Sequence, residues 1–119
     1  EQTKKEMLAR ADDPNKEWQL ADLSARGEKV YAANCVACHQ ATGKGVPGAF
    51  PALEGSKVVL GKREDHIAIM LNGKAGTAMA SFKGLSDTEL AAVITYARNA
   101  WGNKAEDGLI QPAAVKAAR

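Results

Sequence analysis

The sequence predicts a small all-α domain in which three main helices are joined by long, irregular loops. Its 119 residues suit one domain with loose ends. Apolar residues recur at helical spacing in residues 20–34, 62–74 and 86–102, and we find no convincing strand or internal repeat. Both cysteines and one of the two histidines lie within residues 35–39, directly after the first of these segments. The chemistry of the domain is therefore expected to begin where the first helix ends.

The first helix is expected from residue 20 to residue 34. Gly27 lies in its middle, where a glycine costs about 1 kcal/mol relative to alanine. We interpret Gly27 as a point of close packing against another helix, the alternative being a tolerated surface glycine. The positions that would form its buried face are Leu20, Leu23, Gly27, Val30, Tyr31 and Asn34.

Two long loops flank the second helix. Residues 41–56 contain four glycines and two prolines, and long loops in compact domains usually carry function. Residues 62–74 then predict a short helix that stops at Asn72-Gly73, and residues 75–85 form the second loop.

The third helix has the clearest boundaries. Ser86 and Glu89 have the spacing of a capping box, and Gly102 supplies a stop signal. Its apolar face would comprise Leu90, Val93, Ile94, Ala97 and Trp101. Residues 105–119 carry no strong pattern and are expected to form a C-terminal tail with frayed last residues. Residues 1–17 are expected to be a linker, with Trp18 as the side chain that could fold back onto the domain.

Composition argues against several classes of function. The formal net charge is only +2, from 16 basic and 14 acidic residues, so the basic stripe of a nucleic-acid binder is missing. No apolar run approaches the roughly 20 residues that span a bilayer. Aromatic residues make up only 5% of the chain, so its core buries modest apolar area. Small domains of this kind often need a disulfide, a metal or a cofactor.

Cys35, Cys38 and His39 have the C-x-x-C-H spacing of covalent c-type haem attachment. Two thiols three positions apart, at the end of a helix, can add to the two vinyl groups on one edge of a porphyrin. The next residue can then direct its imidazole towards the iron. We therefore predict one covalent haem c.

Three other kinds of site could use the same residues. A thioredoxin-like motif is expected near a βαβ pattern, which the chain lacks. A structural zinc site needs four ligands, and Cys35, Cys38, His39 and His66 could supply them only without the usual second closely spaced pair. A disulfide between cysteines this close would enclose too small a loop to stabilise much.

The sixth iron ligand is predicted to be Met79. Met7 lies in the linker, Met70 is expected in the core with Ile67 and Leu71, and His66 is expected to be a solvated surface histidine. Met79 lies instead in a glycine-rich loop just before Phe82, and a loop can bring a thioether to the iron. His/Met ligation raises the reduction potential and favours electron transfer, because both axial positions are filled.

These motifs together resemble the class I cytochromes c. The resemblance implies the fold of that family, with loops that wrap one haem. Gly27 and Tyr31 match the positions that pack against Val93 and Tyr96 of the last helix. It also implies that the Pro51 carbonyl accepts a hydrogen bond from His39, and that Met79 is the methionine ligand. Leu53 would pack on the haem, and Phe82 is included among the cofactor-binding residues.

Residues 17–104 are also very similar to the cytochrome c domain fused to subunit II of some bacterial cytochrome c oxidases. This resemblance implies a domain at residues 18–104, excised from a membrane-anchored protein at the periplasmic or outer face of the inner membrane. A redox protein would donate electrons, and the copper centre of the oxidase would accept them. The domain alone would be an electron-transfer module, soluble and monomeric. A free periplasmic carrier is the alternative, followed by a haem enzyme such as a peroxidase with an open iron site.

Partner docking is expected at the haem edge near the thioethers. Two kinds of residue could serve it: loop lysines that steer association, or small apolar side chains that form a short-lived contact. The lysines are Lys44, Lys57, Lys74 and Lys83, and the apolar residues are Val46, Ala49, Ala78 and Ala80.

Overall fold

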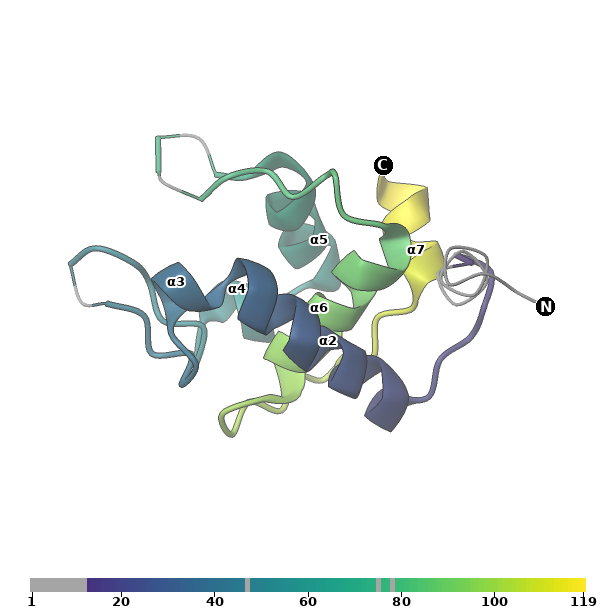
Figure 1. Cartoon of the computed structure of the whole chain (residues 1–119), viewed down its shortest axis with the longest axis horizontal. Helices are drawn as coiled ribbons and strands as arrows, with labels where there is room; N and C mark the ends of the chain where they lie inside the picture. The colour runs from purple at the N-terminus through teal and green to yellow at the C-terminus, as the bar shows by residue number, and fades with distance from the viewer. Residues whose placement is uncertain (1–12, 47, 75, 78) are drawn as a thin grey trace.

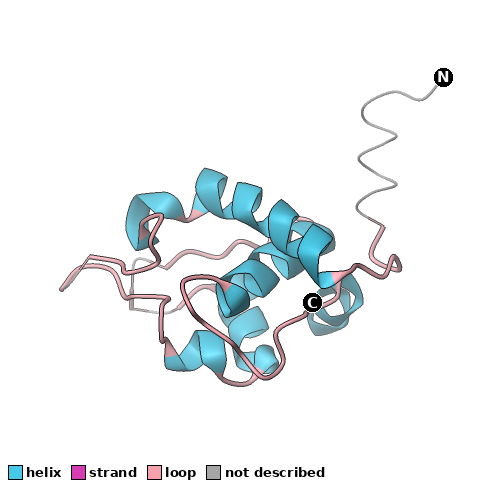
Figure 2. Cartoon of the chain, turned by 90° about the horizontal axis from the view of Figure 1, so that it is seen from below, coloured by secondary structure: helices cyan, strands magenta, loops and turns pink. Residues whose placement is uncertain are grey.

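The computed structural model describes residues 13–119 except 47, 75 and 78, and the described part contains six helices and no strand. The helices are α2 (Leu20–Asn34), α3 (Val36–His39), α4 (Lys57–Leu60), α5 (Arg63–Asn72), α6 (Asp87–Asn99) and α7 (Pro112–Ala118). The prediction of an all-α domain with three main helices, α2, α5 and α6, is confirmed (Figures 1 and 2). None of the helices in these residues is long and apolar enough to cross a membrane.

Helices α2 and α6 cross in close contact, and Gly27 makes this contact possible (Figure 1). A Cβ atom at Gly27 would overlap the carbonyl oxygen of Ala92 and lie 2.7 Å from the Cβ of Tyr96. The interpretation of Gly27 as a packing position is therefore confirmed. Beside the crossing, the ring of Tyr31 lies 5.5 Å from that of Tyr96 and 5.2 Å from that of Trp101, measured between centroids.

The start of α6 is as expected, whereas its end is not. The capping box is present, with Glu89 N donating to Ser86 Oγ and Ser86 N donating to Glu89 Oε1. The helix ends at Asn99, however, rather than continuing to residue 102. Trp101 (φ 56°) and Gly102 (φ 84°) form a left-handed turn after it, and this turn directs the Trp101 ring onto Tyr31.

The C-terminal segment completes the core, and the expectation that its last residues are frayed is wrong, because α7 extends to Ala118 and Arg119 donates to Lys83 O and Leu85 O. Ile110 and Val115 are fully buried in the same hydrophobic core as α2, α5 and α6, and α7 packs beside α6 (Figure 1). The N-terminal side is tied to this segment. Trp18 N donates to Gln111 Oε1 and Gln111 Nε2 donates to Trp18 O, each at 2.9 Å, so Trp18 does fold back onto the domain.

Two loops project from the same side of the helical core, at the left of Figure 1. The first joins α3 to α4, and the second joins α5 to α6. Helix α4 was not expected from the sequence. Ser56 begins it as N-cap, with Oγ accepting from Val58 N and Val59 N. Together these segments surround the cavity described next.

Candidate functional site

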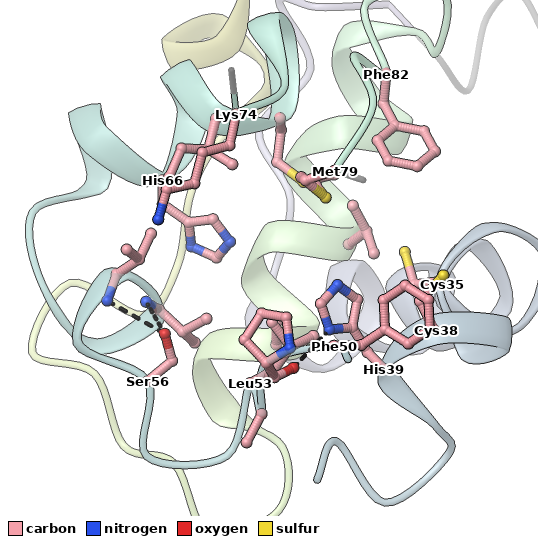
Figure 3. Close-up of a pocket in the computed structure, with 18 of the residues that line it drawn as sticks. Cys35, Cys38, His39, Phe50, Leu53, Ser56, His66, Lys74, Met79 and Phe82 are labelled. Carbon is pink, nitrogen blue, oxygen red and sulfur yellow. Dashed lines mark hydrogen bonds between the residues drawn. The ribbon is translucent and has the colours of Figure 1, made fainter. Parts of the chain in front are cut away.

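One cavity of about 600 Å³ brings together most of the side chains that the sequence singled out. Its walls come from the end of α2, from α3, α4, α5 and α6, and from the two projecting loops. Figure 3 shows Cys35 and Cys38 on one side of this cavity and His66, Lys74 and Ser56 on the other. Apart from Met7, which lies outside the described residues, every residue weighed as an iron or haem ligand lines it.

The two thiols lie where α2 gives way to the short helix α3. Cys35 N donates to Tyr31 O at 2.8 Å and His39 N donates to Cys35 O at 2.9 Å, so the motif is wound into one helical turn. Neither cysteine forms a disulfide. Burial, followed by the proximity of Cys38, raises the pKa of Cys35 to about 11, so this thiol is protonated at neutral pH. This thiol and that of Cys38 face the cavity from one side.

The orientation of His39 is set by a hydrogen bond from its Nδ1 to the carbonyl oxygen of Pro51, at 2.9 Å. Because a carbonyl can only accept, Nδ1 carries the proton and Nε2 keeps a free lone pair. The loop folds tightly enough for this only with a glycine at position 45. A Cβ at Gly45, whose φ is 66°, would lie 2.6 Å from Pro51 O.

Met79 projects its sulfur into the cavity from the side opposite the His39 ring (Figure 3). Its backbone is held by two hydrogen bonds, from Lys74 N to Met79 O at 3.0 Å and from Met79 N to Thr77 Oγ1 at 3.2 Å. Gly73 ends α5 with φ 71°, and a Cβ there would lie 2.7 Å from Met79 O. The loop can therefore present a thioether and an imidazole to one group placed between them.

Two competing ligands take other positions. Met70 is 7% exposed in the core cluster, as expected, although it also lines the cavity from α5. His66 is 6% exposed, so the expectation of a solvated surface histidine is wrong. Burial and the nearby charge of Arg98 lower the pKa of His66 to about 4. The helical spacing already contained this signal, because His66 lies four residues before Met70 and hence on the same face of α5.

The remaining cavity wall is mostly apolar. Leu53 and Phe82, both expected at the cofactor, are half-buried and line it. Helix α4 and its N-cap contribute Ser56, Val58 and Val59 to the wall. The sequence does not predict this contribution, because a one-turn helix leaves no periodic pattern. The serine N-cap before an apolar run was the one local sign of it.

These features fit a haem better than a zinc ion. An apolar cavity of this size, with two thiols on one side and a nitrogen and a sulfur ligand facing each other, suits a flat macrocycle with an iron at its centre. His66 lies across the cavity from the cysteines (Figure 3), so the four ligands of the zinc alternative are not brought together. In the described residues no three His, Cys, Asp or Glu side chains group as a metal site would require.

Comparison with known proteins places the same segment in one family. The family model described as "Cytochrome C oxidase, cbb3-type, subunit III" matches residues 22–96. This match includes the cysteine motif, both loops and most of α6.

Individual relatives include both small and large proteins. The chain is 40% identical over 98 residues to cytochrome c-552 of Thermus thermophilus, a match that covers 71% of this chain and 66% of the relative. It is 39% identical over 88 residues to cytochrome c6 of Leptolyngbya boryana, covering 71% of this chain and 96% of that protein. It is 30% identical over 96 residues to the cbb3-type cytochrome c oxidase subunit CcoP of Azospirillum brasilense, covering 76% of this chain but only 32% of that subunit. The chain thus spans just under two thirds of the first relative and about a third of the last.

Proposed function

The chain belongs to the class I c-type cytochromes, and from this premise we propose that it transfers single electrons through a haem held between His39 and Met79. As in its family, the cofactor is one covalent haem c, which would supply one-electron chemistry between Fe(II) and Fe(III). The observation that carries the proposal is the single cavity that receives both thiols, the His39 imidazole and the Met79 thioether.

Cys35 and Cys38 would form the thioether bonds to the haem. Both thiols are free, both line the cavity, and they lie one helical turn apart. Covalent attachment suits a small domain of this kind, because it prevents loss of the cofactor.

His39 and Met79 would be the two axial ligands. The hydrogen bond from His39 Nδ1 to Pro51 fixes the ring and makes Nε2 a better electron donor to a metal. A thioether as the second ligand favours Fe(II) and so raises the reduction potential. With both positions filled, small oxidants have no open site on the iron, which favours electron transfer over catalysis.

For the biological setting we propose a haem module of an oxidase subunit II, which passes electrons from a redox protein to the copper centre of the oxidase. The match to the cbb3-type oxidase family and to CcoP supports an oxidase context. In this setting the module would work at the periplasmic or outer face of the inner membrane, attached to a membrane-anchored protein.

A free periplasmic carrier is the second candidate, and a specific observation favours it. The cytochrome c6 relative is matched over 96% of its own length, so a similar chain can be a whole protein. The two candidates differ in what the gene encodes beside residues 1–119. A reading frame continuous with two membrane helices and a copper-binding domain would support the module, and its absence would support the carrier.

The ligand assignment is tested by one substitution made at two methionines. Met79→Leu is expected to abolish the weak far-red sulfur-to-iron band of the oxidised protein and to let carbon monoxide bind the reduced iron. Met70→Leu is the control, because Met70 lines the same cavity from a helix. Visible spectra with and without carbon monoxide provide the measurement. A wild-type spectrum that shifts readily with carbon monoxide would contradict the closed site and favour a haem enzyme or a sensor.

Steering by loop lysines is the second prediction. Lys44 is exposed in the loop between α3 and α4. The next residue, Gly45, donates from its backbone N to His39 O, so the charge of Lys44 lies near the proposed haem edge. We expect Lys44→Glu to slow oxidation of the reduced protein by ferricyanide several-fold at low ionic strength, with the difference fading as salt rises. Lys116→Glu, an equal charge change on α7, serves as the control. Equal rates for the two variants in stopped-flow measurements would argue against steering.

A further inference from the structure

The cavity contains a buried polar side chain that neither the covalent attachment nor the axial ligation uses. His66 is 6% exposed, and its Nδ1 is fully buried without a hydrogen-bond partner among the described residues. Figure 3 shows the imidazole of His66 pointing into the cavity, on the side away from Cys35 and Cys38.

The arrangement of substituents on a haem determines which of its groups would lie on the His66 side of the cavity. Its two vinyl groups, which the cysteines take, are on one edge of the macrocycle, and its two propionate carboxylates are on the opposite edge. With thioethers at Cys35 and Cys38, the carboxylates would lie towards the opposite wall, which Ser56 and His66 line. A carboxylate in a mostly apolar cavity needs hydrogen-bond donors.

That wall supplies donors of two kinds. Lys57 and Lys74 are exposed and remain in contact with solvent. Ser56 Oγ accepts from Val58 N at 3.2 Å and from Val59 N at 3.4 Å, which leaves its own proton available to donate. His66 is the buried donor among them, and hydrogen bonds to charged groups are strongest where water is excluded.

The state of His66 follows from its surroundings. Burial and Arg98 keep the imidazole neutral at neutral pH, so it carries one N–H. Arg98 is 1% exposed, and its Nη1 is also fully buried without a partner. Since neither His66 Nδ1 nor Arg98 Nη1 has a hydrogen-bond partner among the described residues, no contact holds the ring proton on Nδ1, and Nε2 can carry it. Nε2 is the ring nitrogen left to face the cavity that His66 lines, because Nδ1 is fully buried although the cavity is open.

We propose that His66 is a positioning residue that donates a hydrogen bond from Nε2 to a haem propionate and thereby raises the reduction potential. The inference rests on the proposed function, because it needs the haem attached at Cys35 and Cys38. A donor to the carboxylate withdraws negative charge from the neighbourhood of the iron. Without it, the uncompensated carboxylate would stabilise Fe(III) and lower the potential.

The test compares three variants of the haem-loaded protein. His66→Leu removes the donor, His66→Gln retains a side-chain N–H, and Ile67→Val changes a buried α5 residue that does not line the cavity. We expect the midpoint potential of His66→Leu to fall below wild type, together with a shift of the propionate vibration in resonance Raman spectra. His66→Gln should return both towards wild type, and Ile67→Val should change neither.

Other outcomes separate the two proposals. A closed His/Met spectrum in wild type with an unchanged potential and vibration in His66→Leu would overturn the role of His66 alone. Carbon monoxide binding by His66→Leu but not by wild type would make His66 an iron ligand and overturn it as well. A wild-type protein without covalent haem would overturn both proposals.

A second measurement is available if His66→Leu does not fold. In reduced wild-type protein labelled with ¹⁵N at histidine, the proposal predicts a slowly exchanging ring N–H on His66. A His66 ring proton that exchanges rapidly with water would overturn it.

Discussion

At the scale of single residues, the proposed iron ligands are positioned by backbone groups. His39 is oriented by its hydrogen bond to the carbonyl oxygen of Pro51. Met79 lies in a loop that is closed by a hydrogen bond from Lys74 N to Met79 O. Both arrangements depend on a glycine that brings two backbone segments together, at Gly45 and at Gly73. A side chain at Gly45 would collide with Pro51, which orients His39, and one at Gly73 would collide with Met79 itself.

Gly73 allows this dependence to be tested. Gly73→Ala is expected to weaken the far-red sulfur-to-iron band and to admit carbon monoxide, because its Cβ would lie 2.7 Å from Met79 O and displace the loop. Gly76→Ala is the matched control. It has a similar φ, 78° against 71°, but nothing lies within 4 Å of its Cβ.

Both substitutions should lower the free energy of unfolding by about 1–2 kcal/mol, because each forces an L-residue into a left-handed conformation. Only Gly73→Ala should change the spectrum. If both variants keep the wild-type spectrum, the contact between Gly73 and Met79 does not position the sulfur.

At the scale of elements, the α2–α6 crossing places the cysteine motif. Helix α2 ends at Asn34, and α3 begins at Val36, so the direction of α2 fixes where Cys35 and Cys38 project. That direction is set by close contact with α6 at Gly27 and by the aromatic cluster of Tyr31, Tyr96 and Trp101. Tyr31 belongs to both the crossing and the cavity wall.

Gly27→Ala is therefore expected to destabilise the protein strongly, despite the better helix propensity of alanine. Its Cβ would overlap Ala92 O and lie 2.6 Å from Ala92 C, and backbone atoms cannot move aside as a flexible side chain can. We expect the free energy of unfolding to fall by about 3 kcal/mol, the upper part of the usual range for overpacking. Denaturant titration measures it.

Gly84→Ala provides the control for this variant. A Cβ at Gly84 would meet nothing within 4 Å, and its φ is not in the left-handed region. Its stability should stay within about 0.5 kcal/mol of wild type, as is usual for surface substitutions. If the two variants have equal free energies of unfolding, α2 and α6 can move apart without loss of stability, and the proposed role of Gly27 is wrong.

At the scale of the whole molecule, the two ends of the described chain complete the core on the side away from the cavity. Ile110 and Val115 are fully buried, and Gln111 exchanges two hydrogen bonds with Trp18. Thr95 Oγ1 of α6 accepts from Ile110 N at 3.0 Å. Helix α6 therefore contacts both the cavity and the C-terminal segment.

Because Ile110 is buried in the core, we expect it to contribute to stability as the core residues of α2, α5 and α6 do. Ile110→Ala should lower the free energy of unfolding by about 2–5 kcal/mol, the range for removing a buried isoleucine. Leu60→Ala, at a residue that is 37% exposed, should lower it by less. Equal effects in denaturant titrations would indicate that residues 105–119 do not belong to the cooperative unit.

Much of the site could be predicted from the sequence because its signals are local. Three of these signals each depend on a few neighbouring residues: the Cys35–His39 spacing, the Ser86–Glu89 cap and the glycine stop at Gly73. Helical geometry converts such spacings into defined positions in space. The boundaries of α2 followed in the same way from its apolar period. The covalent haem and the family fold were accessible from this information alone.

The tertiary structure decided what depends on distant contacts. The burial of His66 beside Arg98 joins α5 to α6, and the burial of Ile110 and Val115 joins a segment without a strong pattern to helices far away in the chain. The contact of the Trp101 ring with Tyr31 likewise joins residues far apart in the chain, although the turn itself contains the predicted Gly102 stop. Local spacing determines helices and motifs, whereas burial depends on which surfaces meet, and only the folded chain brings those surfaces together.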